Sequence, residues 1–140
     1  MSITKEQFIN GLNKALEWEY ASAIQYVQHS AVITGAEYDS ITKELIIHSN
    51  EEMAHAVNLS VLICDLGGTP TVEAEKRETS ENSKTMLEQD LKGEEIAITL
   101  YKKLIKQAEE LQEYGARRML EDILIQEEEH RRDILNSLGR

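Results

Sequence analysis

Four long stretches of the chain carry apolar residues at alternating steps of three and four, the spacing of one face of an α-helix. We call such a row of positions the core-facing line of its helix. The second stretch shows it most clearly, with polar residues among aliphatic ones: Ile41, Leu45, His48, Glu52, His55, Leu59, Leu62 and Leu66. The pattern predicts helices at about residues 5–34, 38–66, 82–111 and 115–138.

Residues that begin and end helices agree with these bounds. Thr4 and Gln7 have the spacing of a capping box, and Gly35 suits a helix end. Residues 67–81 contain the chain's only proline, Pro70, and have no helical pattern. A connection of this length can run along a whole bundle, so the third helix need not lie antiparallel beside the second. We therefore predict an all-α chain, one domain of residues 1–140, folded as an antiparallel four-helix bundle with a long crossover.

The composition excludes several classes of function. A formal net charge of −11 disfavours binding to nucleic-acid phosphates and to anionic membranes. No apolar run approaches the roughly 18 residues of a membrane span, and the first residues lack the apolar region of a signal peptide. The single cysteine, Cys64, forms no internal disulfide. We expect a cytoplasmic protein that binds neither nucleic acid nor membrane.

Acidic residues and histidines interrupt the core-facing lines of all four helices. The second and fourth helices each carry a glutamate and a histidine three residues apart, and the first and third carry one glutamate each. The six positions are Glu19, Glu52, His55, Glu94, Glu127 and His130. Burying four carboxylates is costly unless their charge is compensated. Two divalent cations would cancel it, so the pattern predicts a site for two metal ions inside the bundle.

The two halves of the chain repeat one arrangement. Glu19 and Glu52 are 33 residues apart, and so are Glu94 and Glu127. A tyrosine follows the first glutamate of each half by seven residues, at Tyr26 and Tyr101. We expect these two tyrosines to donate hydrogen bonds to metal-binding carboxylates or to supply an electron.

The types of ligand indicate the metal. Oxygen ligands with one nitrogen per metal favour iron, or manganese as the alternative, over structural zinc, which prefers thiolates in a closed tetrahedral site. Bridging carboxylates can hold two metals about 3.5–4 Å apart, a spacing that lets dioxygen or peroxide bind between them.

Four stretches of the sequence resemble the ferritin-like di-iron superfamily, and bacterioferritin most of all. They are residues 19–26, 51–56, 90–94 and 127–130. The resemblance implies a ferritin-like bundle whose carboxylates act as terminal or bridging iron ligands while each histidine binds one iron. The implied terminal ligands are Glu19 and Glu94, the bridging ligands Glu52 and Glu127, and the histidines His55 and His130.

The resemblance also bears on assembly and on haem. Only ten residues follow His130, whereas bacterioferritins use a short fifth helix to build a cage, so we expect a homodimer, with a larger cage as the alternative. A second apolar line on the second helix, which includes Ile46, Met53 and Val57, predicts the dimer surface. In bacterioferritins the methionine at the position of Met53 binds haem on the dimer axis, but a methionine on such a surface is more often a packing residue.

Other polar and sulphur-containing residues receive simpler interpretations. We interpret His48 as a hydrogen-bonded core residue in preference to a ligand for a third metal, and we identify no partner for His29. Cys64 and Trp18 are interpreted as packing residues. Four further glutamates are expected on solvated helix faces: Glu51, Glu95, Glu128 and Glu129.

The sequence therefore predicts a protein that binds two iron ions per chain and oxidises Fe(II) with dioxygen or hydrogen peroxide. One alternative is a di-iron or di-manganese peroxidase or catalase that stores no mineral. Another is a dimer that binds metal or haem without catalysis. Iron uptake per chain separates the first two, and haem absorbance tests the third.

Overall fold

The computed structural model describes residues 2–140 as an all-α fold, which confirms the predicted fold class. Its four long helices are α1 (Lys5–Val32), α2 (Asp39–Asp65), α3 (Ser83–Glu110) and α4 (Tyr114–Ser137), with a short 3₁₀ helix, η1 (Ala36–Tyr38), before α2. The described residues contain no strand, and none of their helices has the length and hydropathy needed to cross a membrane.

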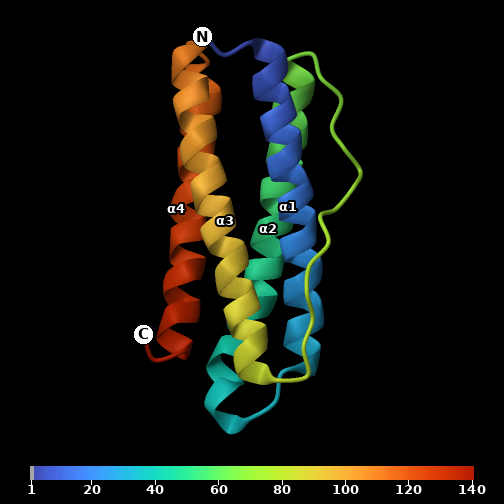
Figure 1. Ribbon diagram of the computed structural model, residues 1–140, viewed down its shortest axis with the longest axis vertical. Coiled ribbons are helices and arrows are strands. Elements are labelled where there is room, and N and C mark those ends of the chain that lie inside the picture. The colour runs from blue at the N-terminus through green and yellow to red at the C-terminus, as the bar shows by residue number, and fades with distance from the viewer. Residues whose placement is uncertain (1) are drawn as a thin grey trace.

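The helices form two antiparallel hairpins that pack side by side (Figure 1). Helices α1 and α2 form one hairpin and α3 and α4 the other, and α1 also packs along α3. Between α2 and α3 the chain runs back along the length of the bundle, so these two helices point the same way (Figure 1). All four helices can therefore present one face to a shared axis.

The ends of α1 and α3 follow from local hydrogen bonds. Thr4 and Gln7 form the predicted capping box, in which the Thr4 side chain accepts from the Gln7 N–H at 3.1 Å and Gln7 accepts from the Thr4 N–H. Helix α1 ends at Val32, and Gly35 turns the chain with a φ of 115° that suits glycine. Asn82 caps α3 by accepting from the Thr85 N–H at 2.9 Å.

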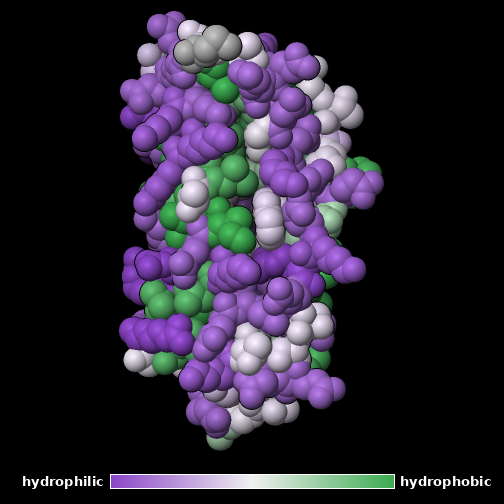
Figure 2. Space-filling model, in the orientation of Figure 1, coloured by the Kyte–Doolittle hydropathy of each residue, from purple (hydrophilic) through white to green (hydrophobic). Residues whose placement is uncertain are grey.

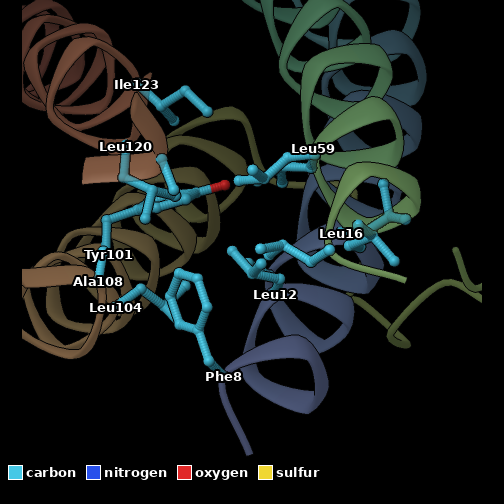
Figure 3. Close-up of a cluster of buried hydrophobic side chains, with 14 of the residues drawn as sticks. Phe8, Leu12, Leu16, Leu59, Tyr101, Leu104, Ala108, Leu120 and Ile123 are labelled. Carbon is cyan, nitrogen blue, oxygen red and sulfur yellow. The ribbon is translucent and has the colours of Figure 1, made fainter. Parts of the chain in front are cut away.

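The apolar core consists of two separate clusters. The larger cluster contains Phe8, Leu12, Leu59 and Leu120, and Figure 3 shows side chains from all four helices pointing toward one another. The second cluster, toward the other end of the bundle, includes Leu45, Leu87 and Ile134. The buried polar residues discussed below therefore lie in a bundle stabilised by burial of apolar surface on either side of them.

The crossover is attached to α1 by several hydrogen bonds. The Thr71 N–H donates to Asn13 Oδ1 at 2.8 Å, and the Glu75 N–H donates to the Glu17 carbonyl at 3.1 Å.

Arg77 of the crossover contacts both α1 and α3. Its guanidinium lies 5.5 Å from the centre of the Trp18 ring and donates to the Gln89 carbonyl at 2.9 Å. A Cβ at Gly93 would lie 2.4 Å from Arg77 Nη2, so a larger residue at this position would displace the guanidinium.

The surface is mostly hydrophilic, with apolar side chains visible between the helices (Figure 2). A different apolar area lies on α1 and α2, where eight aliphatic or methionine side chains are at least 40 % exposed. They are Ile24, Val27, Val32, Ile46, Ile47, Met53, Val57 and Val61. We refer to them as the α1–α2 apolar face.

Candidate metal centre

The structure brings the six residues selected from the sequence into one buried cluster. Each of the four helices contributes, because steps of three and four place these positions on the faces that meet inside the bundle. Their exposed fractions run from 0 % to 4 %, so none of the six side chains is solvated. The cluster is Glu19 on α1, Glu52 and His55 on α2, Glu94 on α3, and Glu127 and His130 on α4.

The cluster divides into two groups of four residues that share Glu52 and Glu127. One group adds Glu19 and His55, and the other adds Glu94 and His130. Within each group one donor atom from every residue lies within 4.8 Å of the others. Each group thus offers three carboxylates and one imidazole to a single cation, and the two shared carboxylates can bridge two cations.

Both imidazoles direct Nδ1 toward the carboxylates. His55 Nδ1 lies 3.0 Å from Glu127 Oε1 and 3.4 Å from Glu19 Oε2. His130 Nδ1 lies 3.1 Å from Glu52 Oε1 and 3.5 Å from Glu94 Oε1. In both rings the same nitrogen therefore faces the place where a cation would be held.

The other nitrogen of each ring meets a hydrogen-bonding partner at the edge of the cluster. His130 Nε2 lies 3.2 Å from Glu51 Oε1, and His55 Nε2 contacts Gln126 Oε1, while the Gln126 amide donates to Glu51. When the ring is neutral, such partners hold its hydrogen on Nε2 and leave the lone pair on Nδ1. The interpretation of Glu51 as a solvated residue is wrong, because its partners come from α4, which the pattern along α2 does not show.

The two tyrosines connect the halves of the chain. The Tyr26 hydroxyl donates to Glu94, and the Tyr101 hydroxyl donates to Glu19, so each tyrosine bonds to the first glutamate of the opposite half. Both phenols are buried. Burial and the nearby carboxylates, Glu94 for Tyr26 and Glu19 for Tyr101, raise both phenol pKa values well above the usual range. Both phenols therefore stay protonated and keep donating.

Several buried atoms of the cluster have no hydrogen-bond partner among the described residues. Because buried polar atoms are normally paired, such a concentration points to a missing partner of opposite charge. The atoms are Glu19 Oε2, Glu52 Oε1, His55 Nδ1, Glu94 Oε2, both Glu127 carboxylate oxygens and His130 Nδ1. They are lone-pair donors that face one another, and therefore fit a pair of metal cations.

Crowding of the carboxylates shifts their titration. Burial, followed by the charges of other carboxylates in the cluster, raises the pKa of Glu52 and Glu127 well above the usual range. Burial acts in the same direction on Glu94, but the nearby His130 imidazole and Glu127 carboxyl outweigh it and lower the pKa of Glu94. Without metal, the cluster therefore shares protons among its members.

The imidazoles respond in the opposite way to their surroundings. Burial alone would lower the pKa of His55, but the close approach of the Glu127 and Glu19 carboxylates raises it to about 10. Burial also opposes protonation of His130, and interactions with Glu94 and Glu127 raise its pKa to about 9. Protons on the two rings therefore occupy the positions that cations would take.

The remaining histidines have partners that the sequence did not reveal. His29 Nδ1 lies 2.8 Å from Asp90 Oδ1, and both side chains are fully buried. Burial raises the pKa of Asp90 to about 6 although His29 opposes that shift. His48 is buried as expected, and its Nε2 lies 3.1 Å from Asp133 Oδ2.

The other side chains interpreted from the sequence are mostly at the surface. Cys64 is exposed, so its interpretation as a packing residue is wrong. Glu95, Glu128 and Glu129 are exposed as predicted. Met53 is 49 % exposed and lines, with Ile24 and Val27 among others, a groove of about 500 Å³ between α1 and α2.

A surface depression reaches the edge of the cluster between α2 and α4. It has a volume of about 570 Å³, and His55 and Gln126 form part of its wall. Its charged wall residues are Glu129, Asp122 and Arg118, the last two forming an ion pair at 3.8 Å. It connects the solvent with the imidazole side of the centre.

Comparison with known proteins assigns this chain to a family. The family model described as a ferritin-like domain matches residues 9–140. The chain belongs to the ferritin-like family. The four-helix bundle agrees with this membership, and proteins named bacterioferritin are among its relatives.

Two curated relatives illustrate the range of the family. The chain is 32 % identical to a bacterioferritin of Brucella melitensis, over 87 % of this chain and 76 % of that protein. It is 30 % identical to a nutrient stress-induced DNA-binding protein of Synechococcus, over 95 % of this chain and 81 % of that protein.

Solved structures give the same assignment. A ferritin-like diiron-carboxylate protein of Bacillus anthracis matches with a TM-score of 0.90 and 30 % identity over 96 % of each chain. A dodecameric, bacterioferritin-related thioferritin of Bacteroides fragilis matches with a TM-score of 0.91 and 26 % identity, over 99 % of this chain and 88 % of that one. The fold of this chain is thus that of solved ferritin-like proteins, and its buried Glu/His cluster consists of residue types that could hold metal ions.

Proposed function

We propose that this chain is a ferroxidase, which binds two Fe(II) ions in the buried cluster and oxidises them with dioxygen or hydrogen peroxide. One observation carries the proposal: seven partnerless oxygen and nitrogen atoms from six buried side chains face a shared interior site. Oxygen donors with one imidazole nitrogen per metal suit iron, and they would also accept manganese. The diiron-carboxylate relative supports the choice of iron.

The proposal assigns each side chain a role. Glu52 and Glu127 belong to both groups of donors and would be the bridging ligands. Glu19 and Glu94 belong to one group each and are terminal ligands, and each receives a hydrogen bond from a tyrosine. His55 and His130 bind one iron each through Nδ1, while Gln126 and Glu51 hold their Nε2 sides.

Iron supplies the electrons of the proposed reaction. Oxidation of two Fe(II) ions to Fe(III) releases two electrons, which with two protons reduce dioxygen to hydrogen peroxide, or hydrogen peroxide to two water molecules. Tyr26 and Tyr101 keep the terminal carboxylates oriented without losing their own protons. The depression at His55 is the route by which Fe(II) would reach the site, and its wall carries Glu129 together with the ion pair of Arg118 and Asp122.

Replacement of one bridging ligand tests the proposal. Glu127→Ala removes a bridging carboxylate from both metals, so rapid oxidation at two Fe(II) per chain should disappear in stopped-flow absorbance measurements. The helical circular dichroism should persist, because the change also removes like-charge repulsion. Glu128→Ala is the matched control, since Glu128 is the exposed neighbour and should leave the rate unchanged. Wild-type-like oxidation by Glu127→Ala would refute the assignment.

We also propose that the chain forms a homodimer through the α1–α2 apolar face. Its eight exposed apolar side chains need a partner surface, and a two-fold axis lets the same face serve both chains. Met53 would then pack close to the axis, as a packing residue and not as a haem ligand. The related thioferritin is dodecameric, and a dimer of this kind would be the building unit if this chain also forms a shell.

A further inference from the structure

A second cluster of metal-binding residue types lies outside the six-residue centre. Glu44 and His48 are four residues apart on α2 and therefore share one face of the helix, and Asp133 approaches them from α4. One donor atom from each of the three lies within 4.8 Å of the others. The cluster is next to the proposed iron site but includes none of its ligands.

His48 is fixed in position by its surroundings. Its side chain is 1 % exposed, and its ring stacks on the ring of His130, with centroids 4.0 Å apart and an angle of 23° between the planes. In this orientation Nε2 lies 3.1 Å from Asp133 Oδ2, while Nδ1 has no hydrogen-bond partner among residues 2–140. The nitrogen beside Asp133 is thus held toward the surface and not toward the centre of the bundle.

The charges of the cluster are not compensated by protein. Within the described part of the chain, neither Glu44 nor Asp133 forms an ion pair with a lysine or arginine. Both carboxylates are partly solvated, with the Asp133 side chain 41 % exposed, so a hydrated ion can reach them without entering the bundle. Two carboxylates and a neutral imidazole carry a charge that one divalent cation cancels.

We propose that Glu44, His48 and Asp133 form a third metal site, which binds one divalent cation of the size of Zn(II), Mn(II) or Fe(II). The 3.1 Å between His48 Nε2 and Asp133 Oδ2 matches neighbouring ligands of one metal, since bonds of about 2.0–2.2 Å at right angles place ligand atoms about 3 Å apart. Water fills the remaining positions, as is usual for a metal at the protein surface with three protein ligands. The site does not depend on what the six-residue centre binds.

The competing explanation is a hydrogen-bonded pair of His48 and Asp133 without metal. Such a pair accounts for the distance between these two side chains. It does not account for Glu44, which adds a second negative charge to the same place on the next turn of α2. The two explanations differ in whether a cation occupies the position between all three residues.

Soaking crystals of the full chain with zinc tests the inference by showing where the metal binds. In crystals soaked with zinc chloride, data collected above the zinc absorption edge should show an anomalous peak bonded to His48 Nε2 and Asp133. Absence of this peak, with the pair left as in the structure, would overturn the inference. A peak here without any at Glu52 and Glu127 would support this site on its own, since the proposed iron site is tested separately with Fe(II).

Equilibrium dialysis against Zn(II) tests the third metal site by counting the zinc ions bound per chain. The double variant Glu44→Gln/Asp133→Asn should bind one zinc ion fewer per chain than the wild type. The control Asp65→Asn/Glu128→Gln removes one exposed carboxylate from each of the same two helices and should bind as many as the wild type. Equal zinc content in Glu44→Gln/Asp133→Asn and the wild type would contradict the proposal.

Discussion

Glu51 and Glu52 are adjacent in the sequence but have different surroundings. Successive residues of a helix point about 100° apart, so Glu52 faces the interior while Glu51 lies at the edge, beside Gln126 and His130 of α4. Steps of three and four along one helix were enough to select Glu52. Glu51 could not be selected in this way, because its role depends on side chains about 75 residues away in the sequence.

The same reason explains the other partners that the sequence did not reveal. His29 meets Asp90, and His48 meets Asp133, across different helices. None of these pairs has a spacing within one helix that would mark it. A pattern along one helix indicates which face is buried, but not which residue of a neighbouring helix lies opposite.

Removal of the Glu51 carboxylate should weaken metal binding without abolishing it. Glu51→Ala takes the acceptor from His130 Nε2, and loss of a partner of this kind typically costs about 10–100-fold in metal affinity. Competition against a chromogenic chelator measures the change. Glu95→Ala is the control, because Glu95 is exposed and stands next to Glu94 in the sequence. This variant should bind metal as the wild type does. Equal affinity of both variants would show that Glu51 has no part in the site.

At the scale of the helices, the internal repeat predicted which residues each hairpin supplies but not how the two hairpins contact each other. The shared spacing of 33 residues predicted that two similar hairpins would each supply two carboxylates and one histidine. It did not predict that Tyr26 and Tyr101 would each bond to the opposite hairpin, which depends on how the hairpins pack. The attachment of the crossover was also not predictable, because residues 67–81 have no periodic pattern and their position depends on contacts such as Arg77 with Trp18.

At the scale of the whole molecule, a buried charged cluster lies within the apolar bundle and makes stability depend on pH and metal. In the folded state the pKa values of Glu52 and Glu127 are raised. The pKa of His55 is raised to about 10, and that of His130 to about 9. A group whose pKa is higher in the folded state stabilises the fold at any pH below its pKa in the unfolded state. This stabilisation is lost as the pH rises through its pKa in the folded state. Two lowered pKa values act in the other direction. The effect of Glu94 falls below about pH 4.5, and that of His48, which burial lowers, falls below about pH 6.5, where it opposes part of the change.

The metal-free protein should therefore melt at a lower temperature as pH rises from about 5 to about 9. We expect a decrease in Tm on the order of 5 °C, since about 1 kcal/mol shifts Tm by a few degrees in a domain of this size. Thermal melts in the presence of a chelator measure the decrease, and added metal should remove most of it. An increase in Tm over this range would contradict the crowding of carboxylates that the structure shows.

Assembly depends on the α1–α2 apolar face. Met53→Asp should break the proposed dimer, because it places two carboxylates close together in an apolar interface. Ile125→Asp is the control, since Ile125 is an exposed apolar residue on α4, outside this face. Multi-angle light scattering at low micromolar concentration should give a smaller mass for Met53→Asp alone. An unchanged mass would show that the chains associate through a different surface.

The binding of two iron ions by the six buried side chains is the central claim, and an anomalous-difference map measures it directly. Crystals soaked with Fe(II) under anaerobic conditions should show two iron peaks about 3.5–4 Å apart within the cluster. One peak should be bonded to Glu19, Glu52, His55 and Glu127, and the other to Glu52, Glu94, Glu127 and His130. A cluster that contains no iron peak, or a single one, would contradict the account.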